Sequence, residues 1–116
     1  MRLNKDLSKE QLILNNTMYK NDFTHALSDT KSRYVVSIKN LYKGSNPSLD
    51  FELLNKITKI VDSEQFDSIG GWNGPDGTYY LDANLHLNKL EYAIGAAKNC
   101  NQISVWDMET QEVIYI

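Results

Sequence analysis

The sequence predicts an α+β domain whose elements follow the order β-α-β-β-α-β-β from residue 33 to residue 116. Three observations predict it: apolar alternation in "RYVVSIKNLY" and "TYYLDANLHL", an apolar stripe at helical spacing between them, and a glycine-rich turn between two strands. The first six elements match the ferredoxin-like split βαβ, in which two helices cover one face of an antiparallel sheet. The last strand adds a sheet edge. The alternative is another α+β fold with a different strand order.

The chain length predicts one domain, because 116 residues bury a single hydrophobic core and are too few for two. We expect residues 33–116 to form that domain. Residues 1–32 have a low apolar density and predict a short helical or flexible N-terminal arm. Within this arm, "SKEQLILNN" and "NDFTHALSD" each suit a short helix, the second with Asn21 or Asp22 as its N-cap.

The first expected strand is "RYVVSIKNLY", in which Tyr34, Val36 and Ile38 lie on one face and Ser37 and Lys39 on the other. The turn "KGSNP" ends it.

A helix is expected next, over "SLDFELLNKITKIVDS", with Asn46 as N-cap and Pro47 at the first helical position. Its apolar residues recur at helical spacing and form one stripe: Leu49, Leu53, Leu54, Ile57, Ile60 and Val61.

The stretch "QFDSIGGWNGPDGTYYLDANLHL" predicts a β-hairpin. A phosphate-binding loop would need its glycines to precede a helix, whereas a strand follows them here. Pro75 and Asp76-Gly77 supply turn dihedrals, and Gly70-Gly71 permits a bulge or a close backbone approach. In the second strand, odd-numbered residues 79–87 lie on one face, and the other face carries Tyr80, Asp82, Asn84 and His86.

The last elements are a helix and a second hairpin. Asn88 and Glu91 have the spacing of a capping box, and Asn99 or Asn101 suits the left-handed end of the helix. The helix stripe consists of Leu90, Ala93, Ile94 and Ala97. The segment "QISVWDMETQEVIYI" predicts the final hairpin, with Ile103 and Val105 pointing inward.

Charge is distributed unevenly along the chain. Residues 1–61 carry ten basic and six acidic residues, a net charge of +4, whereas residues 62–116 carry two and nine, a net charge of −7. The acidic half suits either a solvated surface or a partner with a basic surface, such as a nucleic-acid channel. Because the sequence has neither a membrane-spanning apolar run nor a signal-peptide core, we expect no membrane association and a cytoplasmic location. The single Cys100 forms no internal disulfide and has no catalytic partner pattern.

The chemistry-bearing residues do not form a strong catalytic or metal-binding pattern. Asp82 and His86 lie four residues apart on a strand, about 13 Å by the rise per residue, so they do not share one metal. We therefore expect no enzyme activity, no metal and no cofactor, and interpret these residues as a polar surface stripe. A small ligand-binding domain or enzyme that uses Asp82, Asn84 and His86 is the alternative.

The alternation assigns Trp72, Tyr80 and Trp106 to the sheet face that helices do not cover. Stacked bases would need basic neighbours, whereas these strands carry Asp82 and Asp107, so direct nucleic-acid binding by this face is disfavoured. Aromatic anchors among acidic residues instead favour a protein partner. The alternative is that these aromatic residues have no binding role and only cover the outer face of the sheet. The expected partner-binding residues are Trp72, Tyr80, Asp82, His86, Trp106 and Asp107.

Residues 66–116 carry "GGW", a Pro/Gly turn, "YYLDANLHL", "LEYAIGAAKNCNQ" and "ISVWDMETQEVI" in succession. This run, less than half of the chain, resembles small uncharacterised proteins encoded by phages and other bacterial mobile elements. The resemblance implies no catalytic residues. It implies a context in which small accessory proteins bind and inhibit host defence machinery, including CRISPR effectors, as anti-CRISPR proteins do.

The leading hypothesis is therefore a non-enzymatic protein-binding module, more specifically a mobile-element-encoded inhibitor of a host nucleic-acid-processing defence complex. A third hypothesis is nucleic-acid binding by the basic half, through Lys20, Lys31, Arg33, Lys39 and Lys43. A further hypothesis is a homodimer that forms through the last strand, "EVIYI", because an apolar strand at the edge of a sheet can pair with a second chain.

Overall fold

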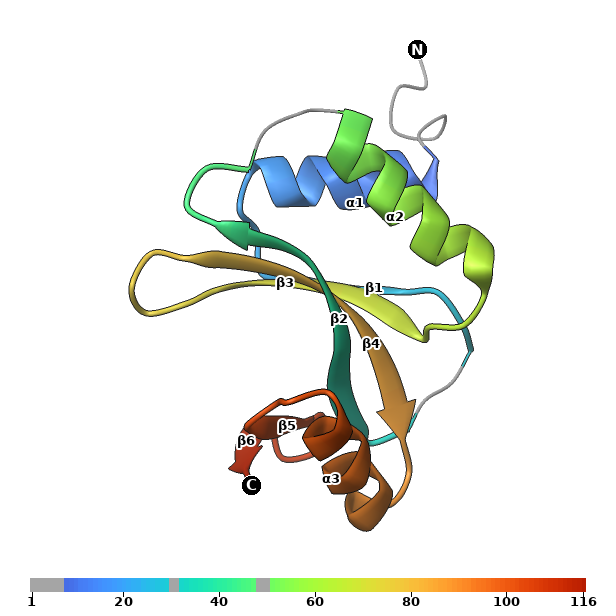
Figure 1. Ribbon diagram of the computed structural model, residues 1–116, viewed down its shortest axis with the longest axis vertical. Helices are drawn as coiled ribbons and strands as arrows, with labels where there is room; N and C mark the ends of the chain where they lie inside the picture. The colour runs from blue at the N-terminus through green and yellow to red at the C-terminus, as the bar shows by residue number, and fades with distance from the viewer. Residues whose placement is uncertain (1–7, 30–31, 48–50) are drawn as a thin grey trace.

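The computed structural model describes residues 8–29, 32–47 and 51–116 and shows an α+β fold with helices and one antiparallel sheet (Figure 1). The described helices are α1 (Lys9–Met18), α2 (Phe51–Ser63) and α3 (Leu90–Asn99). The described strands are β1 (Phe23–Ala26), β2 (Tyr34–Gly44), β3 (Ser68–Asn73), β4 (Tyr79–Leu87), β5 (Ser104–Asp107) and β6 (Glu112–Tyr115). The α+β class expected from the sequence is confirmed.

The sheet has the strand order β1-β3-β4-β2-β5-β6, and every neighbouring pair is antiparallel. The long strands β2 and β4 form its centre, and β1 and β6 form its edges. In Figure 1, α1 and α2 lie across one end of β2 and β4, while α3 lies at the other end.

All three helices pack on the same face of the sheet. Tyr79, Leu81 and Ala83 of β4 join the core under α1 and α2, and Leu87 of the same strand packs with the core under α3. These odd-numbered residues share one side of the strand. The alternation predicted for residues 79–87 is therefore confirmed, and the even-numbered residues of β4 belong to the opposite face.

The N-terminal segment joins the sheet and the core. The first expected helix is present as α1, which begins with a capping box between Ser8 and Gln11 and buries Ile13 and Leu14. The second expected helix is wrong, because "NDFTHALSD" contains β1, which pairs with β3 from Phe23↔Gly71 to Ala26↔Ser68. Pairing with β1 gives the edge of β3 backbone hydrogen-bond partners, and the free energy of this pairing exceeds any local preference of the segment for a helix.

The glycine-rich stretch forms the predicted hairpin between β3 and β4. The Gly74 N–H donates to the Thr78 carbonyl at 2.7 Å, and the Gly77 N–H donates to the Gly74 carbonyl at 3.2 Å. Gly77 has a φ of 87°, which glycine adopts without steric cost. The close backbone approach occurs at Gly71, where an added Cβ would overlap the Tyr79 hydroxyl and the Phe23 ring.

The expected ends of α3 are half confirmed. Lys89 is the N-cap and makes no side-chain cap, so the predicted capping box from Asn88 is wrong. At the other end Asn101 has a φ of 59°, and the Gln102 N–H bonds to the Ala97 carbonyl, which closes a Schellman motif.

Two other expectations concern core positions. Val105 is buried as expected, but Ile103 lies exposed before β5 begins, so its inward assignment is wrong. The expected helix start is wrong at Pro47, because the structure shows Pro47 outside any helix and describes α2 from Phe51 onward. Lys31 and Leu49, the first residue of the expected α2 stripe, lie outside the described residues.

Candidate functional site

The sheet face opposite the helices, here called the outer face, carries the even-numbered side chains of β3 and β4. Because Trp72 is opposite Tyr80 and Ser68 is opposite Asn84, two groups of side chains form along these strands. The group beside the β3–β4 turn is aromatic and exposed. The group at the far end of β3 is polar and buried.

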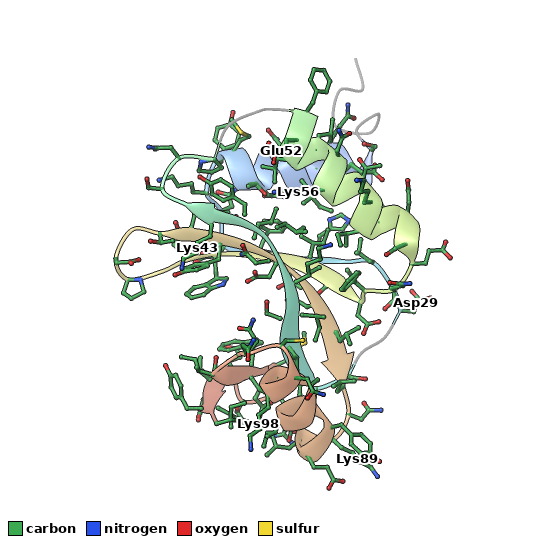
Figure 2. All side chains as sticks on the ribbon, in the orientation of Figure 1. Asp29, Lys43, Glu52, Lys56, Lys89 and Lys98 are labelled. Carbon is green, nitrogen blue, oxygen red and sulfur yellow. The ribbon has the colours of Figure 1, made fainter. Side chains whose placement is uncertain are left out.

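The aromatic cluster consists of Trp72, Tyr80, Asp82, Asn40 and Lys43. The Trp72 and Tyr80 rings stack with centroids 4.5 Å apart and an interplanar angle of 13°. The Lys43 ammonium lies 5.8 Å from the Tyr80 ring centroid, within reach of a cation–π interaction. Figure 2 shows Lys43 close to the hairpin formed by β3 and β4. Trp72 remains 47% exposed, so a large part of its aromatic surface is open to solvent.

Asp82 fixes the orientation of this cluster. Its Oδ1 accepts a hydrogen bond from Asn40 Nδ2 at 2.9 Å, and its Oδ2 accepts one from Trp72 Nε1 at 3.4 Å. Burial raises the pKa of Asp82, and the hydrogen bonds from Asn40, Trp72 and Ser37 oppose that rise. The carboxylate therefore holds the indole in place and does not project as a free acid.

The sequence analysis missed Asn40 and named Lys43 only as a candidate nucleic-acid contact, whereas β2 brings both residues to the aromatic cluster. The β2–β4 register shifts between Ser37 and Lys39 and again between Asn40 and Tyr42. These irregularities place Asn40 opposite Asp82 and Lys43 opposite Tyr80. A strict two-residue alternation along β2 does not predict both partners, because each bulge changes the face on which the following residue lies.

The polar network consists of Ser68, Asn84, His86 and Asp67. Ser68 Oγ lies 2.8 Å from His86 Nε2 and accepts a hydrogen bond from Asn84 Nδ2 at 3.1 Å. Asp67 accepts hydrogen bonds from the His86 backbone N–H and from the Ser28 hydroxyl, both at 2.8 Å. The network thus ties the chain after β1 to β3 and β4.

A serine hydroxyl within hydrogen-bond reach of an imidazole is the geometry of a nucleophile and its base. Here Ser68 is fully buried, and Asn84 and His86 are nearly so. The Ser68 hydroxyl therefore lies inside the fold, where its hydrogen bonds connect β3 to β4. The prediction that Asn84 and His86 form a surface stripe is therefore wrong: the neighbouring strands and the chain after β1 enclose both side chains.

Asp107 does not lie on the outer face. It is 2% exposed and shares a bidentate ion pair with Arg33, with Nε–Oδ1 and Nη2–Oδ2 distances of 2.8 Å. The Arg33 guanidinium lowers the pKa of Asp107 well below its usual range, helped by the backbone N–H groups of Glu109 and Thr110. The expectation that Asp107 is an exposed acid of the outer face is wrong, because its carboxylate is buried and pairs with Arg33.

Trp106 lies on the outer face, as expected, but far from the aromatic cluster. It pairs with Val35 of β2 and is 41% exposed. Lys43 lies at the other end of the same strand, and eight residues of strand span about 25 Å. The structure therefore brings Trp72, Tyr80 and Asp82 together and leaves Trp106 apart. Trp106 instead adjoins Val113 and Tyr115 of β6, and these three residues form the edge patch.

Two further findings concern the described residues. None of their helices has the length and apolar character needed to cross a membrane. Within the same part of the chain, no three His, Cys, Asp or Glu side chains gather closely enough to hold a metal ion.

Comparison of the chain with protein-family models, with curated proteins and with solved structures gave no match.

Proposed function

We propose that the chain is a non-enzymatic protein-binding module that uses the aromatic cluster on its outer face to hold a partner. The observation that carries the proposal is the half-exposed Trp72, held in a fixed orientation by the Tyr80 ring and the Asp82 carboxylate. Rigid tryptophan and tyrosine side chains are the usual anchors of protein interfaces, because they contribute a large contact area and lose little conformational entropy on binding.

The more specific proposal is a phage- or mobile-element-encoded inhibitor that acts in the host cytoplasm on a nucleic-acid-processing defence complex. Six acidic residues of the C-terminal half are exposed, and they suit the basic channel of such a complex: Asp62, Glu64, Asp76, Glu91, Glu109 and Glu112. The resemblance of residues 66–116 to small mobile-element proteins points the same way.

We also propose that β2, α2, β3, β4, α3 and β5 form a ferredoxin-like split βαβ unit, to which β1 and β6 add strands. The order β3-β4-β2-β5 supports it, because each helical crossover then spans one intervening strand.

Affinity purification from the native host, followed by mass spectrometry, tests the binding proposal. The Trp72→Ala/Tyr80→Ala variant should lose the partner that the wild-type chain recovers. Tyr92→Ala, which removes an exposed aromatic residue of α3, should retain it. Circular dichroism checks that both variants fold. Recovery of the same proteins by all three chains would refute the role of the aromatic cluster.

A mobility-shift assay then tests the more specific proposal, that the chain inhibits a nucleic-acid-processing complex. The recovered complex should bind DNA or RNA less tightly when the chain is added, while the chain alone should shift neither at low salt. A partner that has no nucleic-acid affinity would contradict the inhibitor proposal and leave the binding module intact.

A further inference from the structure

β6 forms one edge of the sheet and lacks several of the features by which edge strands avoid pairing. The segment from Glu112 to Ile116, "EVIYI", contains neither lysine nor proline, and the β5–β6 register runs without a shift. Lysine, proline and bulges are three of the usual protections of an exposed edge, whereas β6 has only its short length of four residues and the charge of Glu112. In Figure 1, β6 lies at the margin of the sheet beside the C-terminus, away from α1 and α2.

The hydrogen-bond pattern shows which backbone groups of β6 point outward. The Ile116 N–H donates to the Ile103 carbonyl at 2.9 Å, which marks these two residues as a hydrogen-bonded pair. Hydrogen-bonded and non-hydrogen-bonded pairs alternate in an antiparallel ladder, so Ile114 also bonds to β5. The N–H and C=O groups of Val113 and Tyr115 therefore point away from β5.

The side chains on this edge are apolar and open to solvent. Val113 is 46% exposed and Tyr115 is 74% exposed, and both lie on the outer face with Trp106. Such an apolar surface, next to backbone groups that have no partner among the described residues, is typical of an interaction site.

We propose that β6 pairs with β6 of a second copy of this chain, antiparallel and around a two-fold axis that passes between the two Ile114 residues. Val113 then lies opposite Tyr115 of the partner subunit. Glu112 lies opposite Ile116 of the partner subunit, so no like charges meet.

This register satisfies three conditions at once. Opposed residues share a face, because the positions of each pair have the same parity. The outward N–H and C=O groups of Val113 and Tyr115 all find partners, which gives four hydrogen bonds across the axis. A register centred on Val113 would set Tyr115 against Gln111 of the partner subunit. Gln111 has a φ of 57° and does not extend a ladder.

The interface is small, so the dimer should be weak. Pairing of one four-residue strand, extended by the edge patch, falls in the class of interfaces below about 1,200 Å² that form transient complexes. We expect association that depends on protein concentration, with a dissociation constant in roughly the micromolar range.

Sedimentation equilibrium on the full chain between about 1 µM and 1 mM tests the proposal. Val113→Pro removes an outward N–H and leaves the β5–β6 hydrogen bonds in place, and it should raise the dissociation constant at least tenfold. Tyr115→Lys acts only through an exposed side chain and should have the same effect if Val113→Pro fails to fold. Tyr92→Ala is the matched control and should associate like the wild type.

A disulfide cross-link tests the register. In a Cys100→Ser background, Ile114→Cys should form a covalent dimer under a mild oxidant, because the two Cα atoms face each other across the axis. Val113→Cys should not, since its counterpart lies about 8 Å away. A monomer at every concentration, a dimer insensitive to both edge variants, or a cross-link at Val113 instead of Ile114 would overturn the proposal.

Discussion

Replacing Ser68 with alanine should lower the free energy of unfolding by about 2–4 kcal/mol. The substitution removes one hydroxyl that bonds both His86 Nε2 at 2.8 Å and Asn84 Nδ2 at 3.1 Å. Each buried polar atom that loses its partner costs about 1–3 kcal/mol. The sum lies in the lower part of the combined range because His86 and Asn84 keep a small exposed area through which water can reach them.

Urea unfolding followed by circular dichroism measures this change, and a thermal scan should show a midpoint about 10 °C lower. Ser45→Ala is the control, since Ser45 is exposed in the loop after β2 and should change stability by less than about 0.5 kcal/mol. A Ser68→Ala protein as stable as the Ser45→Ala protein would refute the structural role of the polar network and reopen the nucleophile interpretation.

Two other changes test the packing and the charge pairing. Asp107→Asn should reduce the loss of folding stability at acid pH. The pKa of Asp107 is lowered in the folded protein, so its carboxylate contributes fully to stability above the ordinary pKa of about 3.9. That contribution disappears as the pH falls through the pKa of the folded state. Urea unfolding at pH 7, 4 and 2.5 measures it, and an unchanged acid slope would contradict the Arg33–Asp107 pairing. Gly71→Ala should destabilise the fold by about 1–3 kcal/mol because its Cβ overlaps the Tyr79 hydroxyl, whereas Gly95→Ala, with open space in α3, should stabilise it by about 0.5–1 kcal/mol. Equal unfolding midpoints for the two glycine variants would contradict the close approach at Gly71.

Elements with strong local patterns were predicted from the sequence. The odd-numbered positions of β4 carry apolar residues throughout its nine residues, and the dihedral preferences of Pro75 and Gly77 define the turn before it. The strand β1 has no such pattern, because Phe23 is its one large apolar residue among four. It is a strand because β3 offers it an edge, and the paired residues of that edge are 42 to 48 positions away in the chain. Local propensity does not encode such a pairing.

The residues of the candidate site also differ in whether local sequence patterns predict them. Trp72, Tyr80 and Asp82 were predicted because they belong to one hairpin, whose register follows from its turn. Asp107 was misassigned because its partner, Arg33, is 74 residues away, and neither residue signals the other. Charge counted along the sequence therefore overstated the acidity of the outer face. One carboxylate is neutralised in a buried pair, and Asp82 is committed to Asn40 and Trp72.

The two proposed surfaces lie on one sheet, and their separation has a physical consequence. Four strand spacings of about 4.8 Å separate β3 from β6, and the aromatic cluster lies at the opposite end of β2 from Trp106. Pairing at β6 therefore leaves Trp72 and Tyr80 of both copies uncovered and presents them at two distant points of a continuous sheet. A dimer that is weak alone then gains from a partner with two matching sites, because the first contact raises the effective concentration for the second. The two proposals together therefore predict that the strength of partner binding depends on the concentration of the chain.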